Sequence, residues 1–329
     1  MLLKKSRVLV TGAGGFIGSH LVRALVEKGS KVSALVHYNS RNNWGRLEEL
    51  PREIIKEVKV ISGDIRDPFF VKKITEDSDA VFHLAAAIAI PFSYVAPEHY
   101  VETNIKGTLN VMEAARANKT HKVIHTSTSE VYGTAQYTPI DEKHPLVGQS
   151  PYSASKIAAD KIAESYHRSF GLPVVTVRPF NTFGPGQSAR AVIPTIISQM
   201  LTHGGEVKVG SVGPVRDFTY VKDTVEGFIK AAERAADGET LNLGTGRGVS
   251  VGELIKIISS IAGLKLKIIT DKIRVRPSKS EVLVLISDAS KARRATGWKP
   301  SYTLEDGLRE TIDYVRANIR SYKPEVYNL

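Results

Sequence analysis

Tyr152 and Lys156 are the two residues whose types and spacing point most directly to chemistry. They stand four positions apart at the start of an amphipathic segment, residues 153–170, that predicts a helix, so both side chains lie on one face, a turn apart. A nearby ammonium favours an ionised tyrosine, and we therefore expect Lys156 to lower the pKa of Tyr152 toward neutrality. Tyr152 could then act as a general base. The alternative is an aromatic residue that only caps the helix.

Three further polar side chains, Thr128, Ser129 and Glu130, directly follow a predicted strand at residues 122–127. By residue type alone, Glu130 can be an exposed turn carboxylate, and the two hydroxyl groups can satisfy backbone groups at the strand end. Whether these residues and Tyr152 are functional depends on where the fold places them.

A glycine-rich loop is the second chemical signal. Gly12, Gly15 and Gly18 follow the first predicted strand at three-residue spacing and open the first predicted helix, with Phe16 and Ile17 between them. The first glycine permits a tight turn, the second lets the backbone approach a pyrophosphate, and the third allows close packing of helix on strand. The helix N-terminus adds amide donors and a partial positive charge. We predict dinucleotide binding here rather than a simple turn.

The end of the second predicted strand bears on which dinucleotide binds. An acid at this place would hold the ribose hydroxyls of NAD, but the strand runs into His37 and Arg41 without an acid. Either of these two residues could hold a 2′-phosphate, so the cofactor is predicted as NAD or NADP, with NADP favoured. Asp64 and Ile65, after the third strand, are candidate contacts of the adenine ring, although Asp64 could instead cap a turn.

The elements that must position these residues alternate between strands and helices. Segments with helical spacing lie between short apolar runs typical of strands, which occur at residues 7–10, 31–36, 58–62, 80–84, 122–127 and 173–178. This alternation predicts an α/β fold, a Rossmann-type doubly wound parallel sheet with helices on both faces and ligands at the carboxyl ends of the strands.

The domain organisation is predicted from a change in composition after residue 178, where Gly and Pro become frequent and the predicted strands and helices become shorter. We predict a dinucleotide-binding Rossmann domain over residues 1–180, to which residues 217–245 return. Residues 181–216 and 246–329 are predicted to form most of a smaller, interleaved C-terminal lobe that supplies substrate contacts.

Composition excludes several classes of protein. Of the 329 residues, 42% are hydrophobic and 24% charged, as in a folded soluble domain. There is no cysteine, which excludes disulfides, thiolate metal sites and thiol nucleophiles. The 45 Lys and Arg exceed the 34 Asp and Glu by 11. Because the basic residues are scattered among acids, we expect no nucleic-acid partner; solvated surface charge and phosphorylated ligands are the two explanations for the excess.

Membrane and metal binding are not expected either. The longest apolar run, residues 84–92, is far shorter than the roughly 20 residues that span a bilayer. The basic start of the chain leads into a strand and a glycine loop instead of the apolar stretch of a signal peptide, so we expect a cytoplasmic protein. His83 and His125 lie in apolar runs and are expected in the core. No cluster of His, Asp and Glu has metal-binding spacing.

Together these motifs resemble the extended short-chain dehydrogenase/reductase family, also called the NAD-dependent epimerase/dehydratase family, over nearly the whole chain. The resemblance implies nucleotide-sugar chemistry with a tightly held nicotinamide cofactor that is regenerated at each turnover, and it places Leu84, Ala85 and Ala86 at the cofactor. The motifs that match in the family's order are the glycine loop, His83-Leu84-Ala85-Ala86, Asn104 with Gly107-Thr108, Ser127 to Gly133, Tyr152 to Lys156, Arg178 to Asn181 with Gly184-Pro185-Gly186, and Arg216-Asp217-Phe218 with Tyr220-Val221 and Asp223.

Within this family the residue at position 130 separates the reactions. Sugar 4-epimerases usually carry a small residue there, whereas nucleotide-sugar 4,6-dehydratases carry a Glu, and Ser129 beside Glu130 is similar to the GDP-mannose branch. UDP-glucuronate decarboxylases share the Thr-Ser-Glu but differ around the tyrosine. The stretch from Gln149 to Lys156 is similar to that of UDP-N-acetylglucosamine 4,6-dehydratases of nonulosonic (legionaminic-type) acid synthesis, which gives the predicted function.

Two alternatives are kept. One is a 4-epimerase or a UDP-glucuronate decarboxylase on the same scaffold. The other is a non-catalytic protein that binds a dinucleotide or nucleic acid through its basic surface.

The resemblance also implies roles for single residues. Tyr152, aided by Lys156, would take the proton of the sugar O4, and Glu130 would take the C5 proton. Ser129 could help to protonate the leaving hydroxide, and Thr128 would hydrogen-bond O4 or O6. The family's helices at residues 101–117 and 153–170 form a dimer interface, so a homodimer is expected. Substrate contacts are expected from Asn181, Arg190, Arg216 and Arg276, the last two at the diphosphate or uridine.

Overall fold

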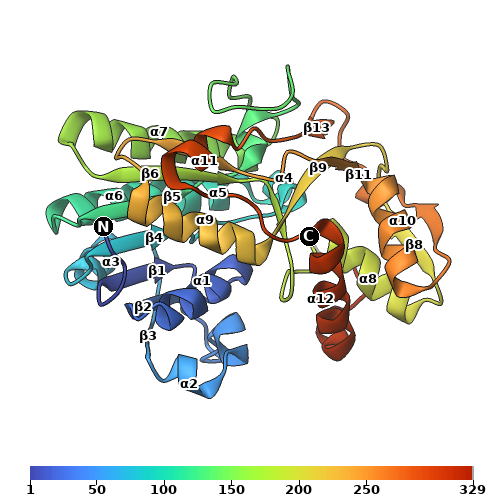
Figure 1. Cartoon of the computed structure of the whole chain (residues 1–329), viewed down its shortest axis with the longest axis horizontal. Helices are drawn as coiled ribbons and strands as arrows, with labels where there is room; N and C mark the ends of the chain where they lie inside the picture. Colours follow the sequence, from blue (N-terminus) through green and yellow to red (C-terminus); the bar gives the residue numbers. More distant parts are fainter. Residues whose placement is uncertain (328–329) are drawn as a thin grey trace.

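A seven-stranded parallel sheet forms the centre of the molecule (Figure 1). The structure is a computed structural model and describes residues 1–327. Every neighbouring pair of strands in this sheet is parallel. In spatial order the strands are β3 (Val58–Gly63), β2 (Lys31–His37), β1 (Arg7–Thr11), β4 (Ala80–His83), β5 (Lys122–Thr126), β6 (Val174–Pro179) and β10 (Thr240–Leu243).

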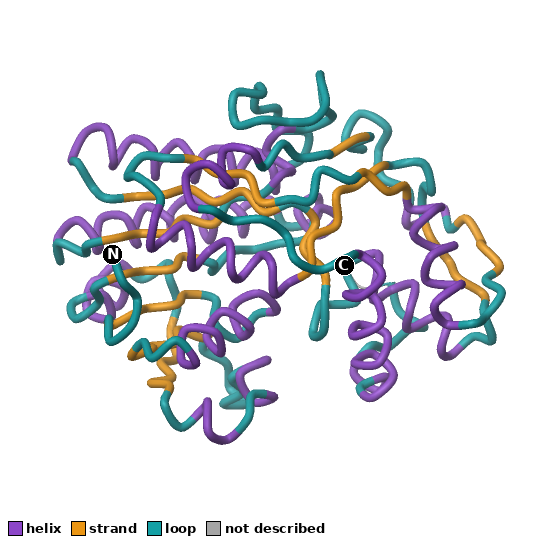
Figure 2. Tube along the Cα trace, in the orientation of Figure 1, coloured by secondary structure: helices purple, strands orange, loops and turns teal. Residues whose placement is uncertain are grey.

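Helices cover both faces of this sheet (Figure 1, Figure 2). On one face α6 (Gly107–Ala117) packs between α3 (Pro68–Thr75) and α7 (Pro151–Phe170). On the other face α9 (Val221–Arg234) packs between α1 (Phe16–Glu27) and α11 (Ser290–Thr296). The predicted Rossmann-type fold is confirmed. The strand order reverses between β1 and β4, which opens a crevice at the carboxyl ends of the strands.

The remaining elements build a smaller lobe beside the sheet. Strand β9 (Val215–Tyr220) pairs with β7 (Asn181–Phe183), β11 (Gly248–Ser250) and β13 (Val284–Leu285). Three helices and a two-stranded sheet complete this lobe: α8 (Val192–Thr202), α10 (Val251–Ala262), α12 (Leu304–Ala317), β8 (Glu206–Val209) and β12 (Lys267–Thr270). Three short helices lie elsewhere along the chain: α2 (Arg52–Ile55), α4 (Ile90–Val95) and α5 (Pro97–Tyr100).

Residues 217–245 are divided between the two sheets. Their first residues belong to β9 in the small sheet. Strand β10 belongs to the seven-stranded sheet, and α9 packs against that sheet. The domain boundaries drawn from the sequence stay a prediction.

Helix α7 starts where its local sequence directs. Ser150 caps it by accepting a hydrogen bond from the amide of Ser153, whose hydroxyl accepts one from the amide of Ser150, and Pro151 occupies the first turn. The helix ends at Gly171, which has the left-handed φ of 66° that glycine tolerates. These end signals place Tyr152 and Lys156 in the first two turns of α7.

The predicted single helix over residues 101–117 is interrupted in the structure. Residues Val101–Lys106 form a π-helical segment, and α6 starts only at Gly107. Within the wider turn, the amide side chain of Asn104 accepts a hydrogen bond from the backbone N–H of Ala87 (2.8 Å) and donates to its carbonyl (3.0 Å) and to Ser155 Oγ (2.9 Å). Such bulges in helices commonly accompany a functional side chain. Within residues 1–327, no helix has the length and apolar character that a bilayer crossing requires.

Asp217 joins the small sheet to the end of β10 and should dominate local stability. Its fully buried carboxylate accepts five hydrogen bonds, from the amides of Thr245, Gly246 and Ser287 and from the hydroxyls of Thr245 and Ser287. We expect Asp217→Ala to lower the free energy of unfolding by at least about 3 kcal/mol, because several buried donors lose their acceptor.

Denaturant unfolding followed by circular dichroism measures this loss. The matched control is Asp313→Ala, which removes an exposed carboxylate paired with Arg316 and should change stability by no more than about 0.5 kcal/mol. Equal effects of the two substitutions would contradict the structural role of Asp217.

Candidate active site

A cleft of about 880 Å³ lies at the carboxyl ends of the sheet strands and brings together most of the residues singled out from the sequence. It is lined by the glycine loop, by the ends of β2, β3, β4, β5 and β6, and by the start of α7. The predicted site residues that line it are Gly12, Gly15, Phe16, Ile17, Gly18, His37, Asp64, Ile65, Leu84, Ala85, Ala86, Thr128, Ser129, Glu130, Tyr152, Lys156, Asn181 and Arg190.

The glycine loop cannot carry larger residues at two of its positions. Gly12 has a φ of 71°, and a Cβ there would lie 2.7 Å from the amide nitrogen of Ala85. A Cβ at Gly18 would lie 2.2 Å from the carbonyl oxygen of Gly12. The loop therefore runs close to the end of β4 and presents backbone to the cleft. In the part of the chain that the structure describes, no side chain caps the N-terminus of α1 at Gly15, so the first amides of this helix are available to an anionic ligand.

The adenosine end of the cleft differs in one respect from the expectation. Arg41 is exposed and is not among the cleft-lining residues, although Asn39 and Asn43 on either side of it are, so its contact with a 2′-phosphate stays a prediction. His37 does line the cleft, and its Nε2 lies 3.6 Å from Asp64 Oδ2. Asp64 also accepts hydrogen bonds from the guanidinium and the amide of Arg66, which hold the pKa of Asp64 below its usual range. Asp64 thus stabilises the turn after β3 by accepting a hydrogen bond from the amide of Arg66, and it also lines the cleft.

Tyr152 and Lys156 lie in the cleft wall, but the pKa expected for the tyrosine is wrong. Burial raises the pKa of Tyr152 above its ordinary value, against the effect of a hydrogen bond with Thr128. Lys156 Nζ instead donates to the backbone carbonyl of Thr126 at 2.7 Å. Burial lowers the pKa of Lys156 to about 8. The pair is one turn apart as predicted; however, in this structure the lysine is directed to the end of β5.

The segment after β5 provides the other polar groups. Thr128 Oγ1 accepts a hydrogen bond from the amide of Glu130 (3.2 Å) and caps the short 3-10 helix Ser129–Tyr132. This turn directs Glu130 into the cleft wall, where its Oε2 is buried and has no hydrogen-bond partner among the described residues. Two other atoms of the cleft wall, Asn181 Oδ1 and Gln187 Oε1, are likewise buried and have no hydrogen-bond partner among the described residues. Buried polar atoms without partners are rare, so this end of the cleft suits a ligand with several hydroxyl or amide groups.

Arg216 and Arg276 lie behind this polar end and do not line the cleft. Both point to Glu281, at 3.6 Å and 3.5 Å between nitrogen and oxygen. Arg216 is buried, which lowers the pKa of its guanidinium, and the charge of Glu130 acts on it in the opposite direction. The two arginines therefore lie together near Glu130, but their direct contact with a substrate stays a prediction.

Some residues of the cleft wall were missed from the sequence. Arg66, Trp44 and Gln187 line the cleft, yet none of them belongs to a motif with a mechanistic signature. Asn104 was noted only as part of a motif, and its role in holding Ala87 depends on the π-helical segment. An aromatic or amide residue in an irregular loop gives no signal of its position in space.

The expectation that His83 and His125 are core residues is confirmed. His83 is 2% and His125 0% exposed, and their rings lie 5.9 Å apart beneath the cleft. His83 bonds Thr11 and Thr108, and His125 bonds Asp160. Burial lowers the pKa of both imidazoles, so both are neutral at neutral pH.

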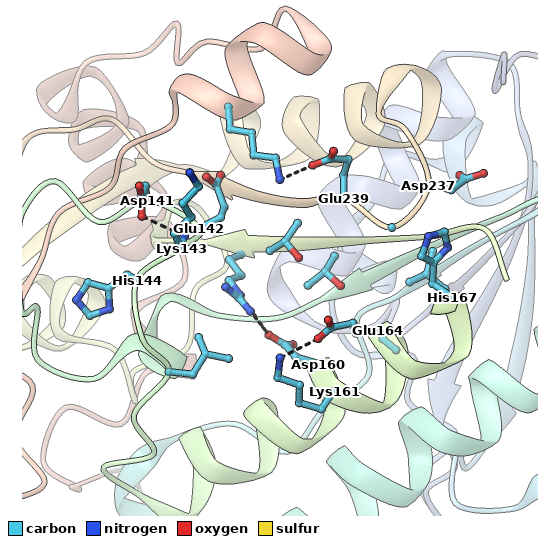
Figure 3. A pocket seen from close by; sticks show the side chains of 18 of the residues that line it. Asp141, Glu142, Lys143, His144, Asp160, Lys161, Glu164, His167, Asp237 and Glu239 are labelled. Carbon is cyan, nitrogen blue, oxygen red and sulfur yellow. Dashed lines mark hydrogen bonds and ion pairs between the residues drawn. The ribbon is translucent and has the colours of Figure 1, made fainter. Parts of the chain in front are cut away.

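A second cavity, of about 1040 Å³, lies between α7, the ends of β6 and β10, and the loop around residues 141–146 (Figure 3). Its wall is strongly charged, but the charges pair with one another, as in Lys161 with Glu164 at 2.8 Å and Lys291 with Glu239. It contains none of the site residues predicted from the sequence.

The fold and the cleft fit a nicotinamide dinucleotide. The open backbone of the glycine loop suits its pyrophosphate, and the apolar Ile65 with Leu84 and Ala85 suits flat rings on either side. Together with the Tyr152 and Lys156 pair, these features define a dinucleotide-dependent enzyme of the short-chain dehydrogenase/reductase class.

Comparison with known proteins gives the family. Residues 9–311 match the family model described as GDP-mannose 4,6 dehydratase. A putative UDP-glucose 4-epimerase of Methanocaldococcus jannaschii is 32% identical over 95% of this chain and 100% of its own length. The chain belongs to the NAD-dependent epimerase/dehydratase family of extended short-chain dehydrogenases/reductases, among nucleotide-sugar 4,6-dehydratases and 4-epimerases.

Two solved structures agree with this assignment. The dTDP-glucose 4,6-dehydratase of Streptomyces venezuelae, solved with NAD bound, superposes with a TM-score of 0.85 at 30% identity over 97% of this chain and 99% of that chain. The UDP-N-acetylglucosamine 4-epimerase of Methanobrevibacter ruminantium superposes with the same TM-score at 32% identity, over 96% and 99%.

Gly12→Ala should abolish dinucleotide binding. The new methyl group would press on the backbone between Leu84 and Ala85, and the left-handed φ adds about 1 to 2 kcal/mol of strain. Calorimetric titration with NAD⁺ and NADP⁺ measures the loss. Gly29→Ala is the matched control, because Gly29 has a φ of 85° but its Cβ would meet only Lys4 Cγ at 3.7 Å. It should lose stability and keep binding; loss of binding in both variants would contradict the assignment of the loop.

Proposed function

We propose that this protein is a nucleotide-sugar 4,6-dehydratase that acts on UDP-N-acetylglucosamine and uses a nicotinamide dinucleotide kept bound through the cycle. The observation that supports this most is Glu130, a carboxylate in the cleft wall with a buried oxygen that has no partner among residues 1–327. A 4-epimerase needs no second base, whereas a dehydratase must remove the proton on C5. Glu130, in electrostatic contact with Tyr152, is the group placed to do so.

The residues of the chain divide the proton transfers between them. When bound, the dinucleotide supplies a hydride acceptor and donor, and the positive charge of its oxidised ring favours ionisation of Tyr152. Tyr152 Oη then takes the proton of the sugar O4 as C4 is oxidised. Thr128, which hydrogen-bonds Tyr152, stabilises the phenolate, and Lys156, one turn along α7, adds positive charge. The resulting C4 ketone acidifies the hydrogen on C5. Glu130 takes this proton and returns it to the hydroxide that leaves C6, so that one water is lost. The resulting C5–C6 double bond would then accept the hydride at C6 and, at C5, the proton that Tyr152 took from O4. This gives the 4-keto-6-deoxy sugar and would leave the bound dinucleotide oxidised again.

Other polar groups fit the remaining parts of the substrate. Asn181 offers an acceptor that has no hydrogen-bond partner within residues 1–327, and Arg190 lines the same cleft. Arg216 and Arg276 supply positive charge for the diphosphate, provided that substrate binding draws them from Glu281. These contacts explain a few of the eleven excess positive charges.

A 4-epimerase is the second candidate, favoured by the epimerases among the similar proteins. It would use Tyr152 and Lys156 alone. Incubation of the protein with a panel of UDP-N-acetylglucosamine, UDP-glucose, dTDP-glucose, GDP-mannose and UDP-glucuronate, followed by mass spectrometry, tests the proposal. Loss of one water from UDP-N-acetylglucosamine supports it. An isomer of unchanged mass means an epimerase, and loss of carbon dioxide from UDP-glucuronate means a decarboxylase.

Glu130→Gln should reduce dehydration by at least about 100-fold, because the amide cannot accept the C5 proton. Oxidation at C4 should persist, since it uses Tyr152, and reduced dinucleotide should accumulate and be visible by its absorbance. The control is Glu142→Gln, which removes a partly buried carboxylate outside the cleft. Undiminished water loss in Glu130→Gln would exclude Glu130 as the base.

The preference for NADP also stays a proposal, and it now depends on His37. His37→Asp should lower the ratio of NADP⁺ to NAD⁺ affinity at least about tenfold, because a carboxylate repels the 2′-phosphate and accepts from the ribose hydroxyls. Competitive binding titrations measure the ratio. Arg41→Ala should lower it less, since Arg41 is not among the cleft-lining residues. An unchanged ratio in His37→Asp would remove His37 from the cofactor site.

A homodimer is proposed as well. The helices expected at its interface, α6 and α7, pack side by side; Val101, in the segment that leads into α6, and Leu109, in α6 itself, are exposed. The expected place of the protein is the cytoplasm.

A further inference from the structure

A buried group of charged and polar side chains lies behind Tyr152 and Lys156, outside the cleft wall. Its centre is Asp160, which follows Lys156 by one turn of α7 and is 4% exposed. His125 from β5 and Arg178 from β6 complete it, and both are buried. None of these three residues has a part in the chemistry derived above.

The carboxylate of Asp160 accepts four hydrogen bonds from two neighbouring strands. Its Oδ2 accepts from Ser127 Oγ (2.8 Å) and from two nitrogens of Arg178 (3.1 Å and 2.9 Å). Its Oδ1 accepts from His125 Nε2 (3.1 Å). Figure 3 shows Asp160 at the wall of the second cavity, which Arg178 also lines. Asp160 therefore ties α7 to the ends of β5 and β6.

Thr126, the last residue of β5, lies between the two residues that bind Asp160 on this side, and it is the residue that holds the lysine. His125 and Ser127 flank Thr126, and the carbonyl of Thr126 accepts the hydrogen bond from Lys156 Nζ at 2.7 Å. Alternate residues of a strand point to the same side, so one carboxylate can hold both neighbours. The position of this carbonyl thus depends on Asp160.

We propose that Asp160 is a positioning residue for the Tyr152 and Lys156 pair. By anchoring both neighbours of Thr126 it fixes the carbonyl that orients the Lys156 ammonium, and its negative charge keeps this buried lysine protonated. The proposal rests on the proposed function in one respect, namely that Lys156 takes part in catalysis.

Electrostatics around the lysine agree with this role. Burial lowers the pKa of Lys156 to about 8, and the charge of Asp160 opposes that fall. Burial would raise the pKa of Asp160, but its hydrogen bond with His125 and the charge of Arg178 bring it down to about 2. Asp160 is therefore an anion throughout the neutral range.

The other titratable groups near Lys156 come from every element packed around it. His83 on β4 and His125 on β5 feel its charge and are neutral at neutral pH. Arg178 on β6 is committed to Asp160. Tyr152, on the same helix, is influenced by Glu130, Tyr100 and Asp160. Among these groups, Asp160 is the one that favours the charged lysine in its pKa.

Titration of Lys156 in Asp160→Asn tests the electrostatic part. Protein labelled with ¹³C at lysine Cε is titrated by NMR without substrate, and the Lys156 signal is assigned by its absence in Lys156→Met. We expect the midpoint to fall by about one pH unit or more when the anion is removed. Glu142→Gln is the matched control and should leave the midpoint unchanged, because Glu142 bonds the amide of Asn242 and not the end of β5.

A folded Asp160→Asn protein with an unmoved midpoint would overturn the proposal. If this variant does not fold because Arg178 loses its partner, Asp160→Asn with Arg178→Met removes both charges, and the same fall is expected. The anchoring part is tested by His125→Leu, which leaves Asp160 charged and does not touch the cleft.

His125→Leu should lower kcat about tenfold on the sugar identified by the panel and leave KM nearly unchanged. An unchanged kcat would overturn the anchoring part. The lysine titration needs no sugar, so failure of every nucleotide sugar in the panel would sink the proposed function while the titration still decides the role of Asp160.

Discussion

A lysine ammonium buried in the wall of the candidate active-site cleft is the constraint on which the rest of the site depends. Lys156 is 4% exposed, and a charge removed from water must be compensated by hydrogen bonds and opposite charge. The carbonyl of Thr126 supplies the first and Asp160 the second. Asp160 in turn needs Arg178, because a buried carboxylate without partners would be costly. One charged residue thus determines the neighbours on two strands.

The same arrangement explains why this chemistry lies at the end of a parallel sheet. Strands β4, β5 and β6 end side by side, so side chains from residues far apart in the chain meet at one edge. The glycine loop after β1 comes close to the end of β4, and its close packing leaves no room for side chains at Gly12 and Gly18. The backbone, with its free amides, is left to face the cleft. The proposed dinucleotide end and the proposed proton-transfer end are therefore built by neighbouring strands of one sheet.

The second lobe is joined to this sheet by polar contacts on both sides of the cleft. Arg46, in the loop after β2, donates its amide hydrogen to the carbonyl of Gly14, and its guanidinium contacts Tyr314 on α12. On the other side Ser280 bonds the carbonyl of Gln149, just before α7. The loop that shapes the adenosine end is thus held by a helix of the other lobe. No local pattern in the sequence indicates either contact.

Periodicity and end signals determined the sheet, its flanking helices and the position of the glycine loop, because each depends on neighbours within one segment. The spacing of Tyr152 and Lys156 likewise fixed their shared helix face. Tertiary structure alone decided the pKa of Tyr152, since burial overcomes the effect expected from Lys156. It also left the Arg41 side chain exposed, placed Arg216 and Arg276 against Glu281, and gave Asp160 its four hydrogen bonds. Desolvation, and the binding of several donors to one acceptor, arise only when segments far apart in the sequence come into contact. The spacing of residues along the chain does not indicate these contacts.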